Sequence, residues 1–222
     1  MRTIVVANGE LGDAAILRAR LASWAEARVI AADGGFANCL ELGLQPEITV
    51  GDLDSLDPSM RSELEAGGAY LLSSPTRKDQ IDLELALLHA REIGANQVVV
   101  LGALGGRLDM TLANVLLLTH PRLSELDLQL WHGDQTAWIL RPPGGDVNGE
   151  AGDLLSLIPL GGDVPRVLTH GLEYPLRNET LSFGPARGVS NMLTGRTARV
   201  ELRAGLLLAV HTPVNPSHIG GV

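Results

Sequence analysis

The sequence of 222 residues is poor in several residue types, and each scarcity excludes a class of protein. Cys39 is the only cysteine, which excludes an internal disulfide and a zinc site built on cysteines. Aromatic residues make up 3% of the chain, too few for the stacking platform of a protein that binds single-stranded nucleic acid. No apolar run approaches the roughly 20 residues of a membrane helix, and the N-terminal run is too short for a signal peptide. We therefore expect a cytoplasmic protein that binds neither nucleic acid nor membrane.

Basic residues are also scarce, and the formal net charge is −9. Most of the excess lies in residues 1–145, which carry 11 basic and 19 acidic groups. This sign is opposite to the one that a phosphate backbone attracts, but an acidic region still binds a phosphorylated ligand when a divalent cation lies between them. Lys78 is the only lysine, which draws attention to its neighbours.

Short apolar strands alternate with helical patterns through the first part of the chain. The pattern predicts strands at 3–7, 28–32, 48–50, 69–72 and 98–101. It predicts helices near 16–21, after Gly34-Gly35, from Asp57-Pro58, over 79–93 and over 108–119. Such alternation is typical of an α/β domain with a doubly wound, mostly parallel sheet, which we place at residues 1–143.

The pattern changes after the α/β region. Residues 141–152 are rich in proline and glycine and are predicted to form a linker. Beyond them the sequence has only short strand-like runs, at 154–158, 164–169, 179–183, 197–202 and 205–210. These runs predict a small all-β sandwich domain at 150–212, followed by a loosely ordered tail at 213–222.

Charged side chains follow the predicted parallel strands. Asp33 follows the second strand, and Asp52 and Asp54 follow the third. Arg107 and Asp109 come after the strand at 98–101 and a glycine-rich turn. Because the carboxyl ends of parallel strands line the ligand crevice of an open α/β sheet, we expect these residues to converge there.

Each local motif admits two interpretations. Asp52 and Asp54 can share a hard cation such as Mg²⁺, or they can form a turn that caps the next element. Asp79 and Asp82, directly after Lys78, can share a metal face of the helix, or they can serve as an N-cap and a first-turn charge. The glycines before Arg107 can make a tight turn, or they can present Arg107 as a phosphate clamp.

Taken together and in order, these motifs resemble the thiamine pyrophosphokinase family. The matching stretches span nearly the whole chain, to about residue 210. They are Ala32-Asp33-Gly34-Gly35, Gly51-Asp52-Leu53-Asp54-Ser55, Lys78-Asp79-Gln80-Ile81-Asp82, Gly105-Gly106-Arg107-Leu108-Asp109 with Asn114, and Gly171-Leu172-Glu173-Tyr174-Pro175-Leu176 followed by Ser190-Asn191.

The resemblance implies an ATP-dependent diphosphotransferase. In that reaction the hydroxyl of thiamine attacks the β-phosphorus of ATP, AMP leaves, and thiamine diphosphate forms. The resemblance also implies a homodimer with sites shared between subunits. It assigns roles to these residues: Asp52, Asp54 and Asp82 to Mg²⁺, with Asp79 close by; Lys78, Arg107 and Asn114 to ATP; and Asp33, Asp109, Ser190 and Asn191 to thiamine, the last two from the other subunit.

Three positions depart from the usual family pattern. Ile81 replaces a threonine, Met110 a histidine and Met192 a glutamate, which affects the expected substrate range more than the chemistry. Two other functions remain open from the sequence. One is a different Mg²⁺-dependent nucleotide phosphotransferase or phosphohydrolase on the same scaffold, and the other is a non-catalytic sensor of thiamine or nucleotide.

Overall fold

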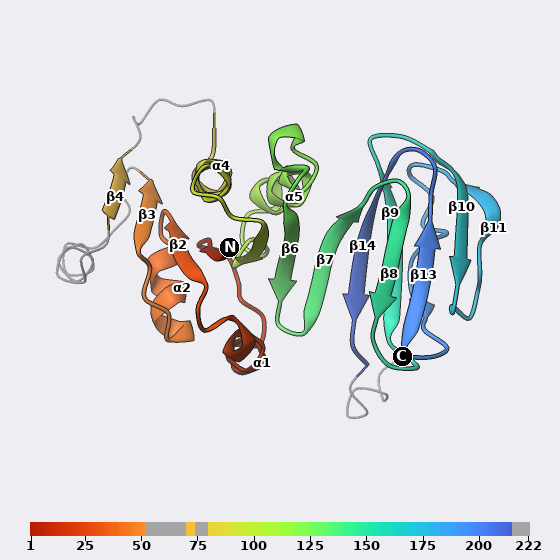
Figure 1. Cartoon of the computed structure of the whole chain (residues 1–222), viewed down its shortest axis with the longest axis horizontal. Helices are drawn as coiled ribbons and strands as arrows, with labels where there is room; N and C mark the ends of the chain where they lie inside the picture. The colour runs from red at the N-terminus through yellow and green to blue at the C-terminus, as the bar shows by residue number, and fades with distance from the viewer. Residues whose placement is uncertain (52–69, 74–79, 215–222) are drawn as a thin grey trace. The chain divides into compact units, whose positions relative to one another are not determined.

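The computed structural model describes residues 1–51, 70–73 and 80–214 (Figure 1). The chain divides into two compact units, Met1–Asp134 and Gln135–Val222. The division falls before the expected end of the first domain at residue 143. The predicted helix from Asp57 lies outside the described residues, and so do residues 215–222 of the tail predicted at 213–222. In the part that is described, no helix is long and apolar enough to cross a membrane.

The first unit is built on a parallel sheet, as the alternating pattern predicts. Its strand order is β6-β5-β1-β2-β3-β4, and every described pair is parallel. The strands are β1 (Arg2–Val6), β2 (Arg28–Ala32), β3 (Ile48–Gly51), β4 (Tyr70–Ser73), β5 (Gln97–Leu101) and β6 (Asp127–His132). Strands β1, β2, β3 and β5 are almost entirely buried, which explains their continuous apolar runs.

Helices cover both faces of this sheet. Helix α1 (Ala14–Leu21) and helix α2 (Gly35–Leu42) pack with Ile4 and Val6 in one apolar core. Helix α4 (Asp82–Glu92) packs against β1, β2 and β3 from the other face. Gly35 allows α2 to start directly on β1, since a Cβ at this position would lie 2.0 Å from the carbonyl oxygen of Val6. Helix α5 (Leu108–Leu117) begins at its predicted residue.

The predicted start of the helix at 79 is wrong. Helix α4 begins at Asp82, and Ile81 before it has an extended backbone with φ −79° and ψ 154°. Asp82 therefore does not share a helical face with Asp79, contrary to the prediction from the sequence. Asp82 does lie in the first helical turn, where a carboxylate interacts favourably with the helix dipole.

The second unit is a sandwich of two antiparallel sheets. One contains β12-β9-β14-β7 and the other β11-β10-β13-β8, with an apolar core shared by both. The strands are β7 (Gln135–Leu140), β8 (Gly144–Asn148), β9 (Leu154–Leu160), β10 (Val164–His170), β11 (Arg177–Leu181), β12 (Asn191–Met192), β13 (Thr197–Glu201) and β14 (Leu206–Thr212). The range predicted as a linker, 141–152, contains β8, which pairs with β13 over five residues. The linker prediction is therefore wrong.

Candidate active site

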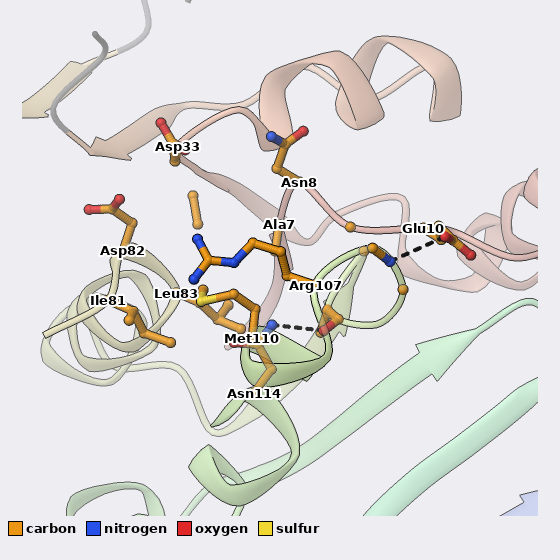
Figure 2. Close-up of a pocket in the computed structure, with 16 residues that line it drawn as sticks. Ala7, Asn8, Glu10, Asp33, Ile81, Asp82, Leu83, Arg107, Met110 and Asn114 are labelled. Carbon is orange, nitrogen blue, oxygen red and sulfur yellow. Dashed lines mark hydrogen bonds between the residues drawn. The ribbon is translucent and has the colours of Figure 1, made fainter. Parts of the chain in front are cut away.

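A pocket of about 520 Å³ opens at the carboxyl edge of the parallel sheet (Figure 2). Its lining comes from the loops after β1, β2 and β5, from the start of α4, and from α5 as far as Asn114. Strand β1 is followed by β2 on one side and its neighbour β5 by β6 on the other, so the chain runs in opposite directions along the sheet from these two strands, which marks the switch point. Open α/β sheets bind their ligands at this point. The lining residues are Ala7, Asn8, Gly9, Glu10, Ala32, Asp33, Ile81, Asp82, Leu83, Gly102, Ala103, Gly105, Gly106, Arg107, Met110 and Asn114.

Asp33 enters the pocket from the end of β2. Its φ of +47° is rare for a residue other than glycine, and its amide donates to the carbonyl of Val50 at 2.7 Å. The neighbouring strand therefore holds Asp33 in this conformation. A rare backbone conformation that its surroundings maintain is common at functional sites.

Asp82 and Arg107 enter the same pocket from the N-termini of α4 and α5. Both residues line the pocket together with Asp33, and in Figure 2 the Arg107 guanidinium extends toward the side of the pocket where Asp33 and Asp82 lie. Arg107 is the N-cap residue of α5, as the sequence predicts. The pocket lining thus combines these two carboxylates, and that of Glu10, with a cation that has five hydrogen-bond donors.

Arg107 also pairs with Asp109 on the exposed side of α5. Its Nε lies 3.1 Å from Oδ1 and its Nη2 lies 2.5 Å from Oδ2, a two-point contact. The hydrogen bond from Arg107 holds the pKa of Asp109 below its ordinary value, and the same bond raises the pKa of Arg107. Asp109 is not among the residues that line the pocket, and its carboxylate is held by the Arg107 guanidinium.

Asn114 lies deeper in the wall of the pocket and is only 8% exposed. Its Nδ2 donates to the carbonyl of Ala103 at 2.7 Å, which ties α5 to the loop after β5. Ile81 and Met110, two of the departures from the family pattern, also line the pocket.

Four predicted site residues lie outside the described part of the chain: Asp52, Asp54, Lys78 and Asp79. Strand β3 ends at Gly51, which lies directly beside Asp33. A Cβ atom on residue 51 would be only 3.1 Å from the Cα of Asp33. Within residues 1–51, 70–73 and 80–214, no three His, Cys, Asp or Glu side chains are grouped closely enough to hold a metal ion.

Sequence reasoning missed three polar residues at the pocket or behind it. Asn8 and Glu10 line it from the loop after β1, as Asp33 does from the loop after β2. Asn38 supports them from α2, since its Nδ2 donates to the carbonyls of Ala7 at 2.7 Å and Gly9 at 2.8 Å. The strand-end argument applied to β1 would have found Asn8 and Glu10, whereas Asn38 has no signal in the sequence.

Ser190 and Asn191 lie in the second unit, where they line a separate cavity of about 520 Å³. Asn191 holds the backbone of Tyr174 at two points: its Oδ1 accepts from the Tyr174 amide at 3.0 Å, and its Nδ2 donates to the Tyr174 carbonyl at 2.7 Å. Ser190 has a φ of +59°, and its amide donates to Ser156 Oγ at 3.0 Å. Like Asp33, Ser190 is therefore held in a rare backbone conformation.

The fold and the pocket define the class: an α/β unit with a ligand site at its switch point, followed by a β-sandwich. Two family models match these units separately. Residues 19–130 match the model described as thiamin pyrophosphokinase, catalytic domain, and residues 146–207 match the one described as thiamin pyrophosphokinase, vitamin B1 binding domain. The chain belongs to the thiamine pyrophosphokinase family.

Individual relatives agree with this assignment. A thiamine pyrophosphokinase from Bacillus subtilis is 27% identical over 82% of this chain and 86% of the relative. Thiamine pyrophosphokinase 1 from rice is 26% identical over 75% of this chain and 66% of the relative. A crystal structure of thiamine pyrophosphokinase from Bacillus subtilis superposes with a TM-score of 0.83 and 25% identity, over 96% of this chain and 100% of that one. As a member of this family, the protein is an enzyme with thiamine diphosphokinase activity.

Proposed function

We propose that the protein transfers a diphosphate group from ATP to the hydroxyl group of thiamine. The hydroxyl oxygen forms a bond to the β-phosphorus, the bond from that phosphorus to the oxygen that bridges it to the α-phosphorus breaks, and AMP leaves with this oxygen. The hydroxyl proton passes to solvent. The observation that carries the proposal is the convergence of Asp33, Asp82 and Arg107 on one pocket at the switch point, in a chain that both family models match.

The proposed metal is Mg²⁺, held by Asp52, Asp54 and Asp82 with Asp79 close by. Carboxylate oxygens are the ligands that this hard cation prefers. The Asp82 carboxylate faces the pocket, and β3 delivers the chain to the same edge one residue before Asp52. The bound cation would neutralise phosphate charge, which is the main requirement of phosphoryl transfer.

ATP binding is proposed for Arg107, Lys78 and Asn114. The guanidinium of Arg107 can hold two phosphate oxygens at once, in the same way that it holds the two oxygens of Asp109. Asn114 contributes through the loop after β5, which it fixes to α5.

Thiamine binding is proposed for Asp33 and Asp109 in the first unit and for Ser190 and Asn191 in the second. The thiazolium ring is cationic, so an acidic surrounding favours it. Asn191 would act with Tyr174, whose backbone it holds and whose side chain is 68% exposed. Met192 stands beside them in place of the usual family glutamate, so we expect weaker discrimination among thiamine analogues.

We further propose a homodimer in which each site takes the second unit of the partner subunit. Helix α5 exposes three leucines at a spacing of four residues, Leu108 (73%), Leu112 (56%) and Leu116 (54%). Exposed Tyr174 and Val189 lie at the cavity of the second unit. Apolar surface of this kind next to a site supports a protein interface there.

Mass spectrometry of the products from thiamine, ATP and Mg²⁺ tests the proposed reaction. The proposal expects thiamine diphosphate and AMP. Thiamine monophosphate and ADP would contradict diphosphate transfer. ATP consumption without thiamine would indicate a phosphohydrolase, and binding of either ligand without turnover would indicate a sensor.

A further inference from the structure

The loops after β1 and β5 are joined to each other by their backbones. The Gly9 amide donates to the Gly102 carbonyl, and the Glu10 amide donates to the Leu104 carbonyl, both at 2.6 Å. These two loops form one side of the pocket. Their relative position therefore decides where the residues that follow the loop after β5 lie.

The Glu10 side chain adds a third connection at the tip of that loop. Its Oε1 accepts a hydrogen bond from the Gly106 amide at 3.2 Å. The carboxyl group also lies against Gly105, where a Cβ would approach the Glu10 Cδ to 2.4 Å. Gly105 and Gly106 have φ values of +85° and +64°, which other residues rarely adopt, so the chain makes a glycine-dependent turn beside the Glu10 carboxyl group.

Arg107 is the next residue after this turn. In Figure 2 its guanidinium points toward the space between Asp33 and Asp82, while the Glu10 carboxylate lies away from that space, beside the turn. The Glu10 carboxylate therefore contacts the backbone just before Arg107. It does not point toward Asp33, Asp82 or the Arg107 guanidinium.

We propose that Glu10 is a positioning residue: by accepting the Gly106 amide it fixes the 105–106 turn and so aims the Arg107 guanidinium at the phosphates of ATP. This inference rests on the proposed function, in which Arg107 binds ATP. In this role Glu10 accepts one hydrogen bond. The position of Arg107, and with it the affinity for ATP, therefore depends on a side chain long enough to place an acceptor oxygen at the Gly106 amide, and not on the negative charge.

Three substitutions separate these properties: Glu10→Gln keeps the acceptor and the length, Glu10→Asp keeps the charge but is shorter, and Glu10→Ala loses both. We expect Glu10→Ala and Glu10→Asp to raise the KM and the Kd for ATP by about three- to tenfold, with the KM for thiamine unchanged within about twofold. Glu10→Gln should remain within about twofold of the wild type. Glu47→Ala, which removes an exposed carboxylate paired with Arg28 outside the pocket, is the matched control.

A double-mutant cycle with Arg107→Ala tests the route of the effect. If Glu10 acts through Arg107, Glu10→Ala should change ATP affinity by less than about twofold in the Arg107→Ala background. If the fold-changes in ATP affinity of the two single variants simply multiply in the double variant, the inference is overturned. It is also overturned if Glu10→Gln weakens ATP binding as much as Glu10→Ala does. If Glu10→Ala does not fold, Glu10→Asp and Glu10→Gln decide the same question.

The readouts also separate this inference from the proposed function. Wild-type production of thiamine diphosphate with unchanged ATP affinity in Glu10→Ala would overturn the inference alone. Absence of that product in the wild type would overturn the proposed reaction. The Kd for ATP, measured by calorimetry with the same variants, would then still decide whether Glu10 positions Arg107.

Discussion

Asp82 and Arg107 are the two pocket residues whose charges suit different parts of the proposed substrate complex, the metal ion and the phosphates. Each enters from the first residues of a helix, where the backbone is fixed by the helix that follows. Asp82 supplies negative charge that suits a cation, and Arg107 supplies a planar set of donors that suits phosphate oxygens. Because the two side chains have opposite charges and separate supports, their substitutions should have distinguishable effects.

Replacing Asp82 by asparagine should remove activity and leave the fold intact. Asparagine has nearly the same shape but lacks the charge that a hard cation requires. We expect turnover to fall by at least about 100-fold, while the cost to stability stays at about 0.3–1 kcal/mol from the helix dipole. Steady-state kinetics and thermal unfolding measure the two effects.

Glu84→Gln is the matched control for Asp82→Asn. Glu84 lies in the same first turn of α4 and accepts from Gln80 at 2.8 Å, but it does not line the pocket. It should lose a similar amount of stability with little change in turnover. Wild-type turnover in Asp82→Asn would remove Asp82 from the proposed metal site.

Replacing Arg107 by lysine should weaken ATP binding although the charge is kept. Lysine cannot reproduce the two-point contact that Arg107 makes with Asp109. Loss of one charge-assisted hydrogen bond corresponds to about a 10- to 100-fold rise in the KM for ATP. Arg199→Lys, at an exposed ion pair with Asp146 outside both cavities, should leave the KM unchanged. An unchanged KM in Arg107→Lys would mean that Arg107 acts only as bulk charge.

Among the secondary-structure elements of the second unit, the turn before β9 is connected to several others through Asp153. Asp153 in this turn is buried, and its carboxylate accepts from the amides of Glu150 at 2.8 Å and Val214 at 3.0 Å and contacts His211 Nε2 at 2.9 Å. Its carbonyl accepts from Leu193, directly after β12. Asp153 thus links β14 to the segment that carries Asn191.

Asp153→Asn should destabilise the protein at neutral pH by about 1–3 kcal/mol, because an amide group would oppose one of these donors. Burial alone would raise the pKa of Asp153, but the hydrogen bonds from Glu150, Val214 and His211 lower it below its ordinary value of 3.8. The stabilisation from the ionised carboxylate is therefore complete well above pH 3.8 and is lost as the pH falls through the lower, folded-state pKa.

Chemical denaturation at several pH values measures this dependence. The difference in unfolding free energy between wild type and Asp153→Asn should be largest near neutral pH and should shrink below the ordinary pKa. Asp146→Asn, an exposed carboxylate on β8, serves as the control. A difference that stays constant down to acid pH would contradict the role of the ionised carboxylate.

Which elements the sequence predicts depends on how deeply they are buried. Strands β1, β2, β3 and β5 are apolar runs buried on both faces, so their pattern is clear. Strand β7 is mostly half-buried, so it has no clear alternation of buried and exposed residues. Strand β8 has the sequence Gly-Gly-Asp-Val-Asn, and only Val147 in it is buried, so neither its β-propensity nor its hydrophobic pattern indicates a strand. Their pairing partners, β14 and β13, are far along the chain, and such contacts leave no local signal.

The candidate site follows the same rule. Asp33, Asp82 and Arg107 were predictable because strand ends and helix starts have local signatures, and these elements meet at one edge of the sheet. The Arg107–Asp109 contact and the support from Asn38 depend on side-chain orientation, which composition and spacing do not determine.

In the molecule as a whole, each of the two units has its own cavity with a different set of polar residues. The first carries the charged pocket, and the second carries the cavity with Ser190 and Asn191. A symmetric dimer with shared sites would bring both sets together twice. This arrangement predicts that two different inactive variants restore activity when they are combined.

Co-expression of Asp82→Asn with Asn191→Ala tests the shared site. In a mixed dimer one site carries both changes and the other carries neither. With free exchange about half of the dimers are mixed, so about one quarter of all sites should be intact, and activity should recover to that level. Activity that stays at the level of the separate variants, with mixed dimers shown to be present, would contradict shared sites.

In the proposed reaction one ATP supplies both phosphorus atoms of the transferred group. A single turnover with enzyme and thiamine in excess over ATP that carries label on both the β- and γ-phosphorus measures this. We expect both labels to appear together in thiamine diphosphate, with one unlabelled AMP for each product molecule. Thiamine monophosphate labelled from the γ-position, accompanied by labelled ADP, would contradict it.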